Sequence, residues 1–225
     1  MTRAVLGFDT ATAATAAAVL LPDGRVVEAR DDPPAGTRPA HASRLLALIE
    51  EVLERAQLEW PDVGRLAVGI GPGGFTGLRI GIATARALGQ SRDLALVGVG
   101  SLHALAAGAP AGDRAHVAAV LDARRGQVFA AVWQAGTLAL EPSALDPDAL
   151  AAQVGPATLA VGDGAVRFRE VLEGAGASVP ADDSPGHRIL AAHVCRLGAA
   201  GEPAGRDELL PDYRREPDAK PPSQP

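Results

Sequence analysis

The sequence predicts an α/β protein with the actin-like, ribonuclease-H-like architecture, in which two similar lobes face each other across a cleft. A short apolar stretch at 4–8 ends on Asp9, and residues 117–121 repeat this pattern and end on Asp122. Each acid is followed by a short turn, a second strand and then alternating strands and helices. A duplicated strand–acid–turn–strand unit of this kind is typical of a two-lobed α/β fold.

Composition limits the class of protein. The chain has 225 residues, 47% of them hydrophobic, which is enough for one large or two small cores. Its net charge of -6 argues against non-specific binding of nucleic acid by this chain alone, although a partner could supply positive charge. The first residues do not resemble a signal peptide, and no apolar stretch reaches the roughly 18 residues that span a bilayer. We therefore expect a cytoplasmic protein, in which the lone Cys195 is a buried free thiol.

The first half of the chain is expected to begin with a meander of strands. A turn signal, PDGR, separates the second strand from the third, and three prolines make the loop at 31–40 irregular. A helix follows the loop, and a strand, the glycine-rich stretch with its helix, another strand and another helix form a right-handed parallel crossover. The expected elements are strands at 3–9, 14–21, 26–30, 65–70 and 94–99, and helices at 41–58, after the glycine-rich stretch, and from 101.

The helix at 41–58 has an unusually broad apolar arc, with Glu50, Glu51 and Glu54 opposite it. Two interpretations remain open: the helix is deeply buried, or part of the arc faces a second protein. The arc consists of Leu45, Leu46, Leu48, Ile49, Val52, Leu53 and Ala56.

The glycine-rich stretch GPGGFTGLRIGIATARALG, residues 71–89, lies between a strand and a helix. Free N–H groups near Thr76 and Gly77 form an anion site in principle. The stretch has no Walker A lysine, and the next strand lacks the acid that a dinucleotide-binding fold uses. Anion binding and a tight turn without a ligand both remain open. The loop consists of Gly71, Pro72, Gly73, Gly74, Phe75, Thr76 and Gly77.

The helix that follows the loop is apolar on two sides, and its small residues let neighbouring elements approach it closely. Such a helix is suited to packing from two directions, one its own sheet and the other a neighbouring helix or another subunit. Together with the preceding helix it predicts a partner interface. The expected interface residues are Leu45, Leu46, Ile49, Leu53, Leu78, Arg79, Ile82 and Arg86.

The second half is expected to supply strands at 117–121 and 127–133, a strand, glycine turn and helix within 157–176, and a helix within 187–201. These patterns divide the chain into an N-terminal lobe at 1–105, a C-terminal lobe at 106–205 and a terminal segment at 206–225. From about residue 216 the segment has the composition of a disordered end.

The segment GPGGFTGLRIG resembles the signature GPGSFTGLRIG of the TsaB family, which takes part in making threonylcarbamoyladenosine in tRNA. The likeness extends over nearly all of residues 3–215, through FDTAT, HASRLLALIEEVL, VGVGSLHALA, LDARRGQVF, VGDGA and LLPDYRR. The chain departs from the family at Gly74, where serine is usual, and at Ala11, where serine is common. The change at Gly74 removes a hydroxyl that could cap the helix or contact an anion.

The resemblance implies the actin-like fold and a non-catalytic role. It implies that the chain pairs with TsaD, the subunit that holds the metal and transfers the threonylcarbamoyl group to N6 of adenosine 37 in tRNAs that read codons beginning with A. It further implies a homodimer in isolation, TsaE (an ATPase) and TsaC as functional partners, and contact with tRNA only through the complex. ATP and metal would be used by those partners, and no cofactor is expected on this chain.

The residues provide a check on this role. TsaD carries an HxxxH pair after the strand that follows its glycine loop, whereas this chain has His103 alone there, so we expect no metal site and no catalytic residue. Asp9 is either a vestigial magnesium ligand or the cap of a turn, and the turn is favoured. Asp122, close to Arg124 and Arg125, is interpreted as a surface ion pair. The alternative function is an actin-like ATPase or kinase, or a metallopeptidase, that acts alone.

Overall fold

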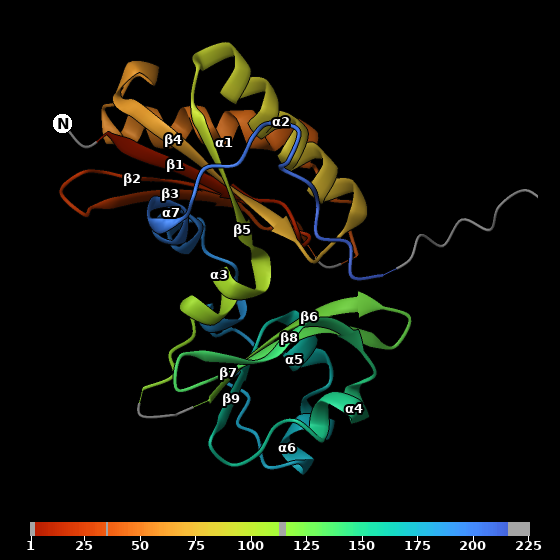
Figure 1. The fold of residues 1–225 in the computed structure, drawn as a ribbon. Coiled ribbons are helices and arrows are strands. Elements are labelled where there is room, and N and C mark those ends of the chain that lie inside the picture. The colour runs from red at the N-terminus through yellow and green to blue at the C-terminus, as the bar shows by residue number, and fades with distance from the viewer. Residues whose placement is uncertain (1–2, 35, 113–115, 216–225) are drawn as a thin grey trace, which may run out of the picture.

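The computed structural model describes residues 3–34, 36–112 and 116–215, and it contains two sheets, one in each lobe (Figure 1). The first sheet has the order β3-β2-β1-β4-β5, in which β1 pairs antiparallel with β2 and parallel with β4. The parallel pairing of β4 with β5 across α2 confirms the expected crossover. The strands of this sheet are β1 (Ala4–Asp9), β2 (Thr15–Leu20), β3 (Val26–Asp31), β4 (Val63–Gly71) and β5 (Ala95–Gly100).

Helices cover both faces of the first sheet. On one face lie α1 (His41–Ala56) and α2 (Phe75–Arg92), which pack against one another and against strand side chains such as Leu6 and Phe8. On the other face lies α7 (Ala191–Ala200), with Cys195 buried as expected. Because alternate residues of β1 point to opposite faces, almost every side chain of this strand is enclosed.

The second sheet has the order β8-β7-β6-β9, with β6 antiparallel to β7 and parallel to β9. Its β6–β7 hairpin and the acid near the end of β6 repeat the arrangement of β1 and β2, which confirms the predicted duplication. The sequence analysis did not identify β8, in which four of the nine residues are exposed and none is buried. The elements are β6 (His116–Arg124), β7 (Gln127–Gln134), β8 (Thr137–Leu145), β9 (Thr158–Val161), α4 (Pro147–Ala151), α5 (Asp163–Arg167) and α6 (Arg169–Gly174).

One apolar core joins the two lobes. It contains Ala67 of β4, Leu121 of β6 and Leu105 of α3 (Ser101–Ala107), together with Val194 of α7. The sequence analysis placed α7 in the C-terminal lobe at 106–205. That placement is wrong, because α7 packs on β1, β2 and β4 of the first lobe.

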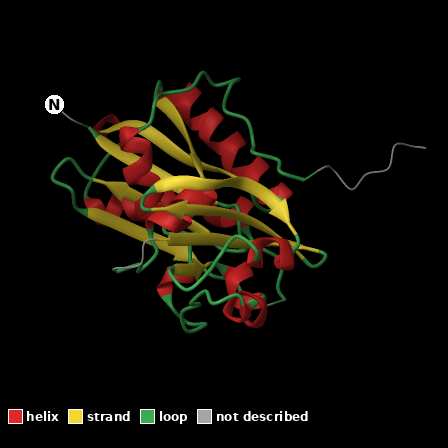
Figure 2. Ribbon diagram, turned by 60° about the horizontal axis from the view of Figure 1, so that its bottom comes forward, coloured by secondary structure: helices red, strands yellow, loops and turns green. Residues whose placement is uncertain are grey.

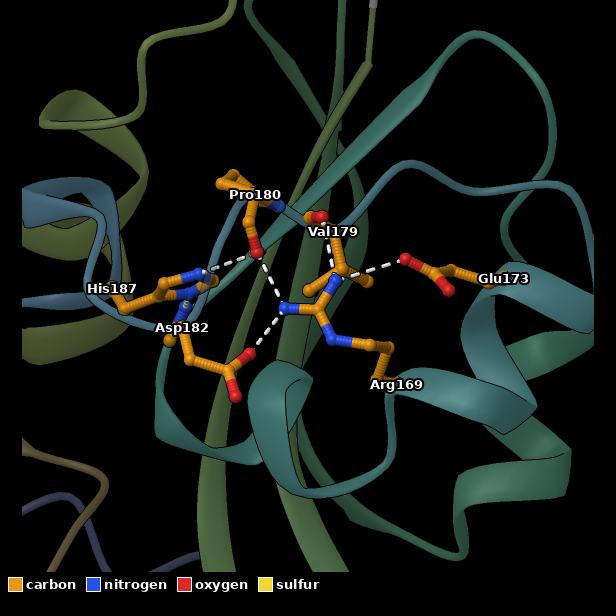
Figure 3. A network of polar contacts seen from close by, with 7 residues as sticks. Arg169, Glu173, Val179, Pro180, Asp182 and His187 are labelled. Atoms are coloured by element: carbon orange, nitrogen blue, oxygen red, sulfur yellow. Dashed lines mark hydrogen bonds and ion pairs between the residues drawn. The ribbon is translucent and has the colours of Figure 1, made fainter.

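A network of polar contacts surrounds Arg169 at the start of α6 in the second lobe (Figure 3). The guanidinium of Arg169 donates to the carbonyl oxygens of Val179 and Pro180 and to the carboxylates of Glu173 and Asp182. His187 belongs to the same network, with its Nε2 atom 3.2 Å from the Pro180 oxygen. These contacts hold the segment between α6 and α7, which includes the short 3-10 helix η2 (Pro185–His187).

After α7 the chain returns across the first lobe as an irregular segment, residues 202–215, which we call the strap. It runs over α2 in Figure 1 and along the outside of the molecule in Figure 2. Ala204 pairs with Leu96 of β5, the Leu209 side chain is 2% exposed, and the Asp212 N–H donates to the Ile70 oxygen at 2.7 Å. The predicted disorder from residue 216 lies outside the described residues. Among those described, no helix is long and apolar enough to cross a membrane.

Candidate partner-binding face and glycine loop

The glycines of the loop allow α2 to pack against the turn that follows β1. A Cβ atom at Gly73 would lie 2.4 Å from the Ala11 oxygen, and one at Gly77 would lie 2.0 Å from the Thr10 oxygen. The turn is tied to the helix by two hydrogen bonds, from the Gly74 N–H to the Ala11 oxygen at 2.7 Å and from the Thr10 hydroxyl to the Gly77 oxygen at 2.8 Å. Close backbone packing therefore accounts for Gly73 and Gly77 without a ligand.

Gly74 differs from its neighbours. It is the N-cap of α2, no side chain caps the helix there, and a Cβ atom would meet only the Ala11 oxygen at 3.5 Å, an ordinary contact. The serine that is usual in the family would fit at this position. Phe75 and Thr76 are exposed beside it, whereas Pro72 is buried.

Asp9 has the turn-capping role that the sequence analysis favoured. Its side chain is buried, its Oδ1 atom accepts the Ala11 N–H at 2.7 Å, and its Oδ2 atom accepts the Ser101 hydroxyl at 2.6 Å. Ser101 in turn accepts the Gly71 N–H at 3.2 Å. Burial raises the pKa of Asp9, and the hydrogen bonds from Ser101 and Ala11 oppose that rise. The carboxylate thus links the turn after β1, the glycine loop and the start of α3.

Most of the predicted interface residues lie in the core of the chain itself. Leu45, Ile49 and Leu53 of α1, with Leu78 and Ile82 of α2, are each at most 6% exposed. The expectation that they contact a partner is therefore wrong for this conformation, because the sheet and the neighbouring helix already cover them. The helical wheel identified a broad apolar arc on α1 but could not show which part of the arc the chain itself covers and which part faces solvent. The exception is Leu46, which is 50% exposed.

The two predicted arginines both hold the strap. Arg86 is half-buried, and its guanidinium donates to the Leu209 oxygen at 2.8 Å. Arg79 is exposed, donates from Nε to the Tyr213 hydroxyl at 3.0 Å, and lies over the Phe75 ring at 3.7 Å. Phe75 and Tyr213 are stacked, with ring centroids 5.3 Å apart. The sequence analysis missed Tyr213, although it quoted LLPDYRR as part of the resemblance.

These contacts join Phe75, Arg79 and Tyr213 into one exposed cluster on the first lobe. Among the described residues, five large apolar side chains are exposed, and all except Leu138 of β8 belong to α1, α2 or the strap. Exposed apolar side chains on elements that pack together, as α1, α2 and the strap do, are typical of an interaction surface. We call this surface the docking face; it consists of Leu46, Phe75, Arg79, Leu210 and Tyr213.

Three of the five histidines have structural contacts within the chain. The His41 ring nitrogen Nδ1 lies 2.8 Å from the Thr15 hydroxyl, and burial lowers the pKa of this histidine. His103 stacks on Trp133 with centroids 5.6 Å apart, and the Nδ1 atom of His187 accepts the Gly162 N–H at 3.1 Å. In the part of the chain that the structure describes, no three acidic, histidine or cysteine side chains are grouped as metal ligands would be.

A pocket of about 440 Å³ lies between the lobes, next to the glycine loop. Its walls include Pro72 after β4, His103 of α3 and Trp133 of β7, and the strap completes them with Asp212 and Arg214. The strap therefore contributes both to this pocket and to the docking face.

Three kinds of comparison relate the chain to known proteins. A family model described as TsaD: tRNA N6-adenosine threonylcarbamoyltransferase matches residues 33–161. The chain is 37% identical over 131 residues to the tRNA threonylcarbamoyladenosine biosynthesis protein TsaB of Escherichia coli, a match that covers 58% of this chain and 54% of that protein. It is 35% identical over 224 residues to an uncharacterized Mycobacterium tuberculosis protein, Rv3421c, a match that covers 96% of this chain and 94% of that protein.

Solved structures agree with the fold. YeaZ from Pseudomonas aeruginosa superposes with a TM-score of 0.79 at 27% identity, covering 94% of this chain and all of that one. An ROK hexokinase from Thermus thermophilus has a TM-score of 0.53 at 13% identity, covering 88% of this chain and 99% of that one, and it supports the actin-like fold alone. The sequence signature, the duplicated fold and these relatives lead to one assignment: the chain belongs to the TsaB family.

Proposed function

We propose that this chain takes part in the biosynthesis of threonylcarbamoyladenosine in tRNA as a non-catalytic subunit that pairs with a TsaD subunit and holds it in an active form. The observation that carries the proposal is the docking face on α1, α2 and the strap. Names of relatives that refer to this biosynthesis support the same pathway.

The proposal also rests on how the glycine loop and Asp9 are used. In an ATPase or kinase of this architecture, these two elements would face a bound nucleotide and its metal ion. Here Gly73 and Gly77 accommodate the turn after β1, and both Asp9 oxygens accept hydrogen bonds from the chain. These contacts favour a partner subunit over the alternative of an enzyme that acts alone.

Reconstitution tests the proposal. Modification of tRNA is measured with TsaD, TsaE and TsaC, with and without this chain. We expect modification to depend on the chain, and we expect the chain alone to hydrolyse no ATP. Turnover by the chain alone that the Asp9→Asn variant abolishes would favour the alternative.

The docking face is tested by pairing with TsaD in gel filtration. Leu46→Asp places a charge on the face, and Tyr213→Ala removes its aromatic stack with Phe75. The matched control is Leu138→Asp, which alters an exposed leucine on β8 of the other lobe, 37% exposed. We expect the first two variants to lose pairing and the control to retain it. Equal pairing by all three would show that TsaD binds elsewhere.

A further inference from the structure

Arg79 is the charged member of the docking face, and two aromatic neighbours hold its guanidinium in place. Phe75 and Arg79 are four positions apart on α2, so their side chains lie on the same face of the helix. The guanidinium lies over the Phe75 ring at 3.7 Å, and its Nε atom donates to the Tyr213 hydroxyl at 3.0 Å. The two rings stack on one another. The positive group is therefore oriented before any partner binds.

The Nη nitrogens of Arg79 remain available to a partner. Among the described residues, none accepts a hydrogen bond from these nitrogens, and none forms an ion pair with this arginine. Asp212, which precedes Tyr213 in the strap, is paired with Arg214 at 2.6 Å instead. Arg79 is exposed, so water satisfies its remaining N–H groups while the face is free.

The surroundings of Arg79 determine what a partner must bring. The other members of the docking face are uncharged, and Phe75 and Tyr213 are 48% and 43% exposed. A partner that covers both rings also covers the guanidinium that contacts them, and removes its water. A buried guanidinium without an acceptor is strongly unfavourable. A partner that fits this face must therefore supply an acceptor to Arg79.

We propose that the partner subunit presents a carboxylate to the Nη nitrogens of Arg79, within an interface that is otherwise apolar. This inference rests on the proposed function, which makes TsaD that partner. A carboxylate accepts paired hydrogen bonds from a guanidinium and neutralises its charge. An RNA backbone presents phosphates in series and is bound by several cations, whereas this face has a single one. The occupant is thus a protein surface with an acidic residue among apolar ones.

Tyr213 is then a positioning residue for this contact. Its hydroxyl accepts from Nε, which leaves both Nη nitrogens directed to other acceptors. Lysine at position 79 could not replace arginine fully, because an ammonium group lacks the planar fork that matches a carboxylate and stacks on a ring. The docking face therefore selects its partner by one oriented charge as well as by apolar contact.

The test measures the affinity of the fluorescently labelled chain for TsaD by anisotropy. Arg79→Met removes the charge and keeps an unbranched side chain over Phe75. We expect affinity to fall about 30-fold or more, because the carboxylate of the partner is left buried and unpaired. Arg79→Lys should lose roughly tenfold, since it keeps the charge without the fork. Tyr213→Phe keeps the stack without the hydroxyl and should lose about threefold.

A matched control separates this contact from a general effect of charge. Arg25→Met removes the same charge from the β2–β3 turn, where the side chain is 71% exposed, and should leave affinity unchanged. Urea titration checks folding, and every variant should unfold near the wild-type midpoint because the substituted side chains are exposed.

A double-mutant cycle identifies the acidic residue on the partner. Each aspartate or glutamate of TsaD is replaced by its amide, and affinity is measured with the wild-type and Arg79→Met chains. One amide substitution should weaken binding of wild type and have little further effect on Arg79→Met.

The other outcomes overturn the inference. They are equal affinity of wild type and Arg79→Met for TsaD, or a cycle in which no acid of TsaD is coupled to Arg79. Arg79→Met that lowers only the affinity of the complex for tRNA assigns the arginine to RNA, and loss of self-association alone assigns it to a second copy of this chain. Failure of the wild-type chain to pair with TsaD refutes the proposed function itself, a result obtained without any Arg79 variant.

Discussion

Gly77→Ala tests whether the glycine loop exists for packing. The added methyl group would lie 2.0 Å from the Thr10 oxygen and 3.1 Å from the Nε2 atom of His41. The first contact is with backbone, so the turn after β1 must move. That movement strains the hydrogen bonds from Thr10 to Gly77 and from Gly74 to Ala11.

The magnitude follows from three contributions. Replacing glycine by alanine within a helix stabilises it by about 1 kcal/mol. Overpacking a closed site costs about 1 to 3 kcal/mol, and weakening the two hydrogen bonds costs about 1 kcal/mol each. We therefore expect the free energy of unfolding to fall by about 2 to 4 kcal/mol, measured by urea titration with circular dichroism.

Two comparison variants isolate the cause. Gly174→Ala makes the same substitution at the end of α6, where no atom lies within 4 Å of the new methyl group, and should leave stability equal or slightly higher. Gly74→Ser adds an N-cap hydroxyl where there is room, for a gain of a few tenths of a kcal/mol. A Gly77→Ala chain as stable as wild type that no longer pairs with TsaD would refute the packing argument.

Four further predictions concern residues outside the loop. Leu45→Asp should lower the free energy of unfolding by at least about 3 kcal/mol because its side chain is 1% exposed, whereas Leu46→Asp on the same helix should leave it nearly unchanged in urea titration. Glu28→Ala should cost about 1 to 2 kcal/mol in the same assay, because this carboxylate accepts the N–H groups of the first two residues of α7; a smaller loss would show that water replaces it. Cys195 should react with a thiol reagent only in denaturant, since burial raises the pKa of its thiol; rapid labelling of the native chain would contradict this. Asp9→Asn should change how the free energy of unfolding depends on pH. Because burial raises the pKa of Asp9 in the folded chain, wild type loses stability as the pH rises above the ordinary carboxyl range, and its stability relative to the variant should increase on acidification. Parallel pH profiles for the two chains would contradict this.

The regular elements of the first lobe could be predicted because their signals are local. The apolar runs that became β1, β4 and β5 are short, bounded by turn residues and enclosed on both faces. Strand β8 was missed because most of it is half-exposed or exposed, so it has no apolar run to identify it. The assignment of α7 to the wrong lobe has another cause, since a helix pattern gives the apolar face but not the sheet that it covers.

The same limit explains the errors at the predicted interface. Leu45 and Leu46 are adjacent in sequence and equally apolar, yet one is enclosed by β2 and β3 and the other faces solvent. Periodicity can give the direction of a helix face only to within the width of its arc. Which edge of that arc is covered depends on the neighbouring helix, and the sequence does not place that helix.

The strap is the part of the docking face that no local pattern could predict. It has no helix and no hydrophobic period, and its position depends on long-range contacts, among them burial of Leu209 and the bond from Arg86 to the Leu209 oxygen. Once Leu209 is fixed, Tyr213 lies beside Phe75 and Arg79. Residues that are more than 130 positions apart therefore form one surface. Under the proposed function, binding of a partner then depends on how the C-terminal segment packs as much as on the glycine signature.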